Sequence, residues 1–157
     1  GNWYTGVNTN SIRTSWIDAG GASSNPLAAG SSGTTSNYLY EHEVGSNDDG
    51  SAMTAYVESA DFDAGDGDQF MFIKRLIPDV AFIGTDTAPE LTYSIKTRDF
   101  PLGSLSTATT ATVTNTTGVA YVRARARQMR VRIESTDVDN SWRLGDTRFD
   151  IKADGRR

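Results

Sequence analysis

The chain has 157 residues, 37% of them hydrophobic, and a formal net charge of -5. This length fits one ordinary domain core or two small ones and is too short for a multidomain enzyme. The absence of cysteine excludes disulfide bridges and thiolate chemistry, and the single histidine, His42, excludes a multi-histidine zinc site. No apolar run approaches the roughly 18 to 20 residues of a membrane-spanning helix, so no membrane partner is expected.

Helical periodicity is almost absent, whereas alternation of apolar and polar residues recurs between clusters of Gly, Ser, Thr, Asn and Asp. This pattern predicts an all-β chain. A first strand is expected over residues 12–17, before a low-complexity stretch at 19–37 that lacks large apolar side chains and reads as a long loop or extended arm. We therefore expect residues 1–37 to form an arm or linker with one short strand, and residues 38–157 to form a β-structural domain.

Two strands are expected next, over residues 38–44 and 52–59, paired as a hairpin that closes through a Gly-containing turn at 46–50. The most apolar segment follows, and it predicts a buried strand over 70–77 that ends or bulges at Pro78.

Residues 90–97 alternate cleanly, with Leu91, Tyr93 and Ile95 on the inward face of a half-buried antiparallel strand. The Thr-rich segment 104–118 suits either an exposed hairpin or a flexible loop. Later strands are expected at 121–133, 142–145 and 147–152. Roughly seven to nine strands in this order predict an antiparallel β-sandwich, with a hairpin or a partial propeller-blade element on the N-terminal side.

Basic charge is concentrated at the C-terminal end. Residues 1–122 hold five basic and fourteen acidic side chains, a net of -9, whereas residues 123–157 hold ten basic and six acidic side chains, a net of +4. Such asymmetry favours charged partners or self-assembly. The strand expected over 121–133 carries five of these basic residues, namely Arg123, Arg125, Arg127, Arg130 and Arg132.

The apolar positions of this strand change parity along its length. They are even-numbered at Val122 and Ala124 but odd-numbered at Met129 and Val131. Because strand side chains alternate between two faces, one extra residue must be absorbed between them, so we expect a β-bulge or a bend near residues 127–128. The arginines either form a solvated face paired with the chain's own carboxylates, or present guanidinium groups to DNA or to a neighbouring subunit.

The acidic counterpart is the segment 41–68, which contains nine carboxylates and neither Lys nor Arg. In a ring of subunits it would face the arginines of the next copy. The acidic interface is expected to comprise Glu58, Asp61, Asp63, Asp66 and Asp68.

The aspartates at 61–68 resemble a calcium-binding loop, but an EF-hand needs an oxygen ligand and a closing glutamate where this chain has Gly65 and Phe72. A different calcium site remains open beside the simpler interpretation of a solvated turn. His42 fits either a pH-sensitive residue or ordinary packing, and the tryptophans Trp3, Trp16 and Trp142 do not cluster in sequence. We assign no catalytic, cofactor-binding or metal-binding residue, and expect neither a cofactor nor enzymatic activity.

Six ordered segments carry a resemblance to a known family: residues 40–45, 60–63, 65–73, 123–132, 142–145 and 154–157. They are similar to the C-terminal region of a family of tailed-phage virion proteins, described as packaged-DNA stabilisation or tail proteins, that sit at the neck, hub or nozzle of short tails. The resemblance covers about residues 36–157. In fuller members this region ends a longer β-rich chain, often a propeller, so the resemblance implies a fragment or a processed product.

Residues and resemblance together favour a non-enzymatic virion structural protein of a phage neck or tail (hub or nozzle), forming a homo-oligomeric ring around the DNA channel. The expected partners are further copies of the chain, other tail or portal-adjacent proteins, and packaged DNA contacted without sequence preference. The alternative is a receptor- or carbohydrate-binding β-sandwich module, which requires an exposed aromatic cluster or bound calcium. A hydrolase built on the aspartates is a third class, for which the sequence provides no geometry.

Overall fold

The computed structural model describes residues 12–21, 23–31, 37–63, 67–106 and 108–156. Every regular element in these residues is a β-strand, and the strands pair antiparallel. The expected all-β, sandwich-like fold is therefore confirmed. Within the same residues there is no helix with the length and hydropathy needed to cross a membrane. The chain divides into two compact units, residues 1–51 and 52–157.

The first unit contains a three-stranded sheet in the order β1 (Ile12–Ile17), β2 (Leu27–Ser31) and β3 (Asn37–Glu41). Strand β2 lies within residues 19–37, so the expectation of a single long arm there was wrong. Its small residues suffice because a sheet is held by backbone hydrogen bonds, which need no large side chains. The unit boundary also falls after Ser51, later than the boundary expected after residue 37.

A two-stranded hairpin of β4 (Asn47–Asp48) and β5 (Ser51–Ala52) follows. Its two turn residues, Asp49 and Gly50, both have positive φ, as tight hairpin turns require. The longer hairpin expected between residues 38–44 and 52–59 does not form. Strand β3 pairs with β2, and β6 (Ala55–Glu58) pairs with β13, because a turn signal marks where a chain reverses but not which strands become partners.

The second unit consists of two sheets. The first sheet has the order β11 (Thr109–Thr114), β10 (Glu90–Arg98), β13 (Gln128–Ser135) and β6, with β7 (Phe62–Asp63) also paired to β13. The second sheet has the order β12 (Ala120–Ala126), β8 (Met71–Ile77) and β15 (Arg148–Ala153). Strands β9 (Val80–Phe82) and β14 (Trp142–Leu144) pair beyond Pro78, where the predicted interruption of the apolar strand is confirmed.

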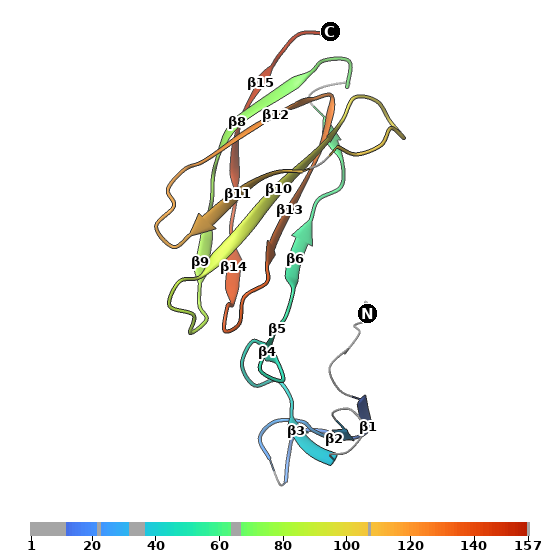
Figure 1. The fold of residues 1–157 in the computed structure, drawn as a ribbon, viewed down its shortest axis with the longest axis vertical. Helices are drawn as coiled ribbons and strands as arrows, with labels where there is room; N and C mark the ends of the chain where they lie inside the picture. The colour runs from blue at the N-terminus through green and yellow to red at the C-terminus, as the bar shows by residue number, and fades with distance from the viewer. Residues whose placement is uncertain (1–11, 22, 32–36, 64–66, 107, 157) are drawn as a thin grey trace. The chain divides into compact units, whose positions relative to one another are not determined.

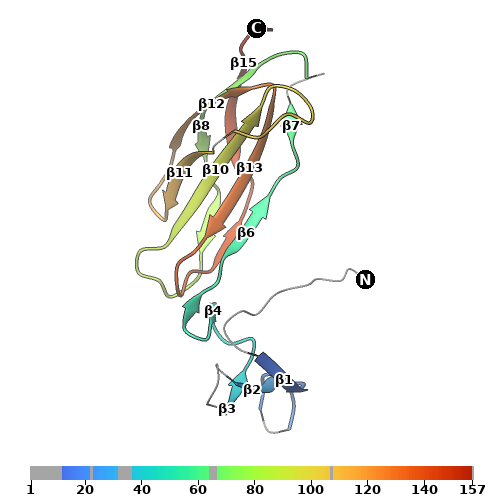
Figure 2. The ribbon, with the colours of Figure 1, turned by 45° about the vertical axis from the view of Figure 1, so that its right-hand side comes forward.

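Buried side chains from both sheets form one hydrophobic core. Leu91, Tyr93 and Ile95 of β10 are all fully buried, as their alternation predicted. They pack in the same cluster as Met71 and Ile73 of β8. The second unit is therefore a two-layer sandwich, and its strands can be followed in Figures 1 and 2.

The arginine-rich segment passes from one sheet to the other. Strand β12 pairs with β8 in the second sheet, and β13 pairs with β10 in the first sheet, so the chain changes layer at Arg127. Figure 1 shows β12 and β13 meeting at one end of the sandwich. The buried positions change parity there, from Ala126 to Met129. The predicted break near residues 127–128 is confirmed, and it is a bend between two sheets.

Candidate functional site: two charged faces of the sandwich

The bend at Arg127 divides the five arginines between opposite faces of the second unit. On β12 the even-numbered side chains are buried, so Arg123 and Arg125 lie on the outer face of the second sheet. On β13 the odd-numbered side chains are buried, so Arg130 and Arg132 lie on the outer face of the first sheet. The single strand expected over residues 121–133 is therefore two strands in different sheets, and the arginines on its two halves lie on different faces because the chain crosses between layers.

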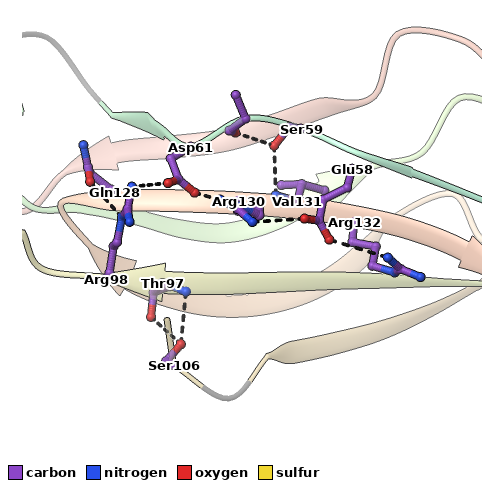
Figure 3. A network of polar contacts seen from close by, with 11 residues as sticks. Glu58, Ser59, Asp61, Thr97, Arg98, Ser106, Gln128, Arg130, Val131 and Arg132 are labelled. Atoms are coloured by element: carbon purple, nitrogen blue, oxygen red, sulfur yellow. Dashed lines mark hydrogen bonds and ion pairs between the residues drawn. The ribbon is translucent and has the colours of Figure 1, made fainter. Parts of the chain in front are cut away.

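Arg130 is the centre of a polar network on the first sheet, drawn in Figure 3. Its Nε donates to Oδ1 of Asp61 at 2.9 Å, and its Nη1 donates to Oε1 of Glu58 at 3.1 Å. Arg98 from β10 also donates to Asp61 through Nη2. One guanidinium on β13 thus holds two carboxylates of the segment that runs along it.

The network extends to Arg132, whose Nη2 lies 2.7 Å from Oε2 of Glu134 and whose Nη1 lies 3.7 Å from Oε2 of Glu58. The guanidinium also stacks on the ring of Tyr56, 3.7 Å from its centroid. Three arginines therefore face three carboxylates, so the ion-paired set is electrically balanced. The set comprises Arg98, Arg130 and Arg132 with Glu58, Asp61 and Glu134.

The electrostatics of the network fix its protonation states. The hydrogen bond from Arg130 lowers the pKa of Asp61, with help from the charge of Arg98, against a smaller opposing effect of burial. The same hydrogen bond raises the pKa of Arg130. Both groups remain charged over a wide pH range, so the network suits holding residues 58–61 in place better than transferring protons.

The other acidic residues are not gathered with this network. Asp63 is exposed at the edge of β7, and Asp68 lies 3.1 Å from the exposed guanidinium of Arg156. Asp66 lies outside the described residues. Within the part of the chain that the structure describes, no group of three or more His, Cys, Asp or Glu side chains is arranged to hold a metal ion.

The outer face of the second sheet is built from three strands in register. Tyr121 of β12 is opposite Arg75 of β8, which is opposite Asp150 of β15. Arg125 and Lys152 flank Phe72 in the same way. Directly opposed residues on paired strands share a face of the sheet, so these side chains form one surface.

This surface carries an excess of positive charge. We call it the basic face, and its cations are Lys74, Arg75, Arg123, Arg125, Arg148 and Lys152. Against these six stand two carboxylates, because Asp150 pairs with Arg75 at 3.1 Å and Asp154 pairs with Arg125. The charged groups of Lys74, Arg123, Arg148 and Lys152 have no polar partner among the described residues. The basic face thus has a surplus of four positive charges.

The end of the basic face near the bend is held by Phe70. The guanidinium carbons of Arg125 and Arg127 lie 4.2 and 5.1 Å from the centroid of its ring. Nη2 of Arg127 donates to the carbonyl oxygen of Arg156 at 3.1 Å, and Nη2 of Arg125 donates to that of Asp154 at 3.0 Å. These contacts orient the two arginines before any partner binds.

A separate aromatic group lies on one face of the small sheet in the first unit. The ring of Trp16 packs edge-on against His42, and Tyr38 packs against Tyr40. Nε of Arg13 donates to Nε2 of His42 at 3.0 Å, so this nitrogen of His42 is an unprotonated acceptor. Trp16 and Tyr38 are each about half exposed, at 55% and 49%.

The tryptophans have different environments. Trp142 packs against the sandwich core and donates from Nε1 to Oγ of Ser135 at 3.0 Å, whereas Trp16 lies on the surface of the first unit. Trp3 lies outside the described residues. Sequence reasoning did not indicate that Trp16 and Tyr38 would share a face, because that depends on the register of β1 and β3 with β2.

Sequence reasoning also missed four members of the basic face: Lys74, Arg75, Arg148 and Lys152. Alternation over residues 147–152 does place Arg148 and Lys152 on one side of a strand. It cannot reveal that β15 and β12 flank the same central strand. A comparison of the chain with known protein families finds no match, and neither does a comparison with curated proteins.

Proposed function

We propose that the chain is a non-enzymatic structural protein of a phage neck or tail, a hub or nozzle subunit that forms a homo-oligomeric ring around the DNA channel. The observation that carries this proposal is the basic face. It spreads six cations and two carboxylates over three strands, an arrangement suited to a large acidic surface. A small ligand would instead need a concave site with a few convergent polar groups.

Four of the six segments that carry the family resemblance contact one another in the second unit, which supports the proposal. Asp61 of the segment 60–63 pairs with Arg130 of the segment 123–132. Phe70 of the segment 65–73 stacks with Arg125, which bonds to Asp154 of the last segment. These segments are far apart in sequence but contact one another in the folded chain. Their contacts give a structural reason for the segments to occur together in one protein.

The chemistry of the carboxylates favours a structural role. A glycosidase needs one carboxyl group that holds a proton and a second that is ionised. Asp61 is held in its ionised form by Arg130 and Arg98, and Glu58 is hydrogen-bonded to Arg130. These two carboxylates therefore act as anchors for arginine side chains.

Electron microscopy of the purified chain over a range of concentrations tests the proposal. We expect closed rings of uniform diameter. When neighbouring subunits bind through two different surfaces, they form a closed ring if the rotation from one subunit to the next is a whole-number fraction of a full turn. Only monomeric particles at the highest concentration would contradict it.

A second candidate function, a receptor- or carbohydrate-binding module, is favoured by the aromatic group of the first unit. Exposed aromatic rings such as Trp16 and Tyr38 can stack on the apolar face of a sugar. Screening the chain against an array of glycans tests this function, with Trp16→Ala as the disabling variant. Tyr121→Ala, which removes an exposed ring of the second unit, is the matched control. Equal glycan signals for all three proteins would reject this function.

A further inference from the structure

We propose that the basic face of one copy binds the acidic first unit of a second copy. This inference rests on the proposed assembly and names the two surfaces that make its contact. The basic face supplies Lys74, Arg75, Arg123, Arg125, Arg148 and Lys152. The first unit, residues 1–51, contains five carboxylates and one basic residue, Arg13, which gives it a net charge of -4.

Two of the carboxylates that had been expected to meet the arginines of a second copy are already engaged. Glu58 and Asp61 bond to Arg130 within the same chain. Breaking these ion pairs would leave charged groups without the partners that offset their desolvation. The first unit, with its larger net negative charge, is therefore the better acidic surface for the contact.

Carboxylates of the first unit retain their negative charge. Glu41 accepts hydrogen bonds from Ser23 at 3.1 Å and Asn25 at 2.9 Å, and Asp18 accepts one from the backbone of Ala19 at 2.8 Å. These donors are neutral, so they orient the carboxylates without cancelling their charge. The first unit is thus complementary to the surplus of positive charge on the basic face.

The composition of the basic face favours a protein partner over a nucleic acid. Asp150 and Asp154 lie among its cations and would repel phosphate groups. Tyr121 and Ile77 are exposed on the same face, at 69% and 43%. Arginine and tyrosine around exposed apolar groups are typical of protein interfaces, whereas nucleic-acid surfaces are more uniformly positive. The acidic first unit on the same chain would also repel DNA.

Sedimentation velocity of the full chain in about 50 mM salt, where charge attraction acts over a long range, tests the contact. The basic-face variant is Arg123→Glu/Arg148→Glu/Lys152→Glu, which changes side chains without polar partners in the described chain. The reciprocal variant is Asp18→Lys/Glu43→Lys in the first unit. Each variant alone should self-associate at least about tenfold more weakly than the parent. An equimolar mixture of the two should regain association, because the intact basic face of one variant attracts the intact acidic first unit of the other.

A single-substitution pair provides the matched control. Lys96→Glu reverses one charge on β10 in the first sheet, whereas Arg123→Glu reverses one on the basic face. We expect weaker association for Arg123→Glu and parental association for Lys96→Glu. Circular dichroism of each variant establishes that its β-structure is unchanged.

The outcomes separate this inference from the proposed function. A parent that remains monomeric would reject the ring and this contact together. A parent that assembles, with a basic-face variant that assembles equally well, would reject only the contact. A variant that assembles normally but loses affinity for double-stranded DNA would assign the basic face to DNA instead. Failure of the mixed variants to associate would also overturn the contact, since the mixture still contains an intact basic face and an intact acidic first unit.

Discussion

Arg130 holds the segment between β6 and β7 on the sandwich. Its two hydrogen bonds reach Glu58 and Asp61, which lie on either side of Ser59. Oγ of Ser59 accepts a hydrogen bond from the backbone N–H of Val131 at 3.1 Å, where a regular ladder would use a carbonyl. The backbone N–H of Ser59 still donates to the carbonyl of Val131 at 2.9 Å, so a side chain replaces one of the two backbone bonds here. The charge-assisted hydrogen bonds of Arg130 strengthen the attachment of this segment.

The substitution Asp61→Asn tests this arrangement. It removes the charge that Arg98 and Arg130 share, so we expect the free energy of unfolding to fall by about 1 to 2 kcal/mol. The exposed neighbour Asp63 provides the control, because Asp63→Asn should leave stability nearly unchanged. Chemical denaturation of the three proteins at neutral pH measures the difference. An equal loss in both variants would show that the ion pairs are not the cause.

The pH dependence of the same variant follows from the lowered pKa of Asp61. The folded-state pKa lies below the ordinary value of 3.8, so the carboxylate stabilises the fold above that value. This stabilisation is lost as pH falls through the folded-state pKa. The stability gap between parent and Asp61→Asn should therefore be constant near neutrality and shrink under acidic conditions. A gap that grows as pH falls below 3.8 would contradict the assigned ionisation.

At the scale of elements, the turn after β9 requires the backbone of residues 83–85 to lie close to the backbone of residues 139–141. The amide nitrogens of Ile83 and Gly84 donate to the carbonyl of Ser141 at 2.8 and 3.1 Å, and that of Thr85 donates to the carbonyl of Asp139 at 3.0 Å. A Cβ on Gly84 would overlap the carbonyl oxygen of Asp139, which is backbone and cannot move aside easily. The absence of a side chain at Gly84 thus lets β9 reach β14.

Gly84→Ala should therefore destabilise the protein by about 2 kcal/mol or more, as overpacking against fixed atoms does. Gly118→Ala is the matched control, because a Cβ there would meet no atom within 4 Å. Thermal unfolding of both variants measures the effect. A melting temperature for Gly84→Ala equal to that for Gly118→Ala would show that the turn can relax at little cost.

Alternation predicted several strands well. The inward positions of Leu91, Tyr93 and Ile95 and the interruption at Pro78 follow from local sequence, because one buried face or one missing N–H determines each. The apolar positions of the arginine-rich segment change from even to odd numbers, and this change predicted the bend at Arg127 because strand side chains alternate between two faces. Strand partners could not be predicted this way. Nothing local to residues 55–58 indicates that β6 pairs with β13, which is far away in sequence.

At the scale of the whole molecule, the charges are segregated in two ways. The first unit has a net charge of -4, and the second has fourteen basic and fifteen acidic residues, a net of -1. Within the second unit the network on the first sheet is balanced, whereas the basic face has a surplus. The sequence could predict the separation between the chain's ends. It could not predict the two faces, because these depend on which layer each half of the arginine segment joins.

The salt dependence of the assembled mass tests the central claim most directly. If the basic face and an acidic surface hold the copies together, light scattering of the full chain should report a large mass at about 50 mM salt and the monomer mass at about 1 M. Screening at the higher concentration acts over only about 3 Å and removes most of the attraction between exposed charges. An assembled mass that stays constant or increases with salt would contradict the claim, because apolar contacts would then hold the copies together.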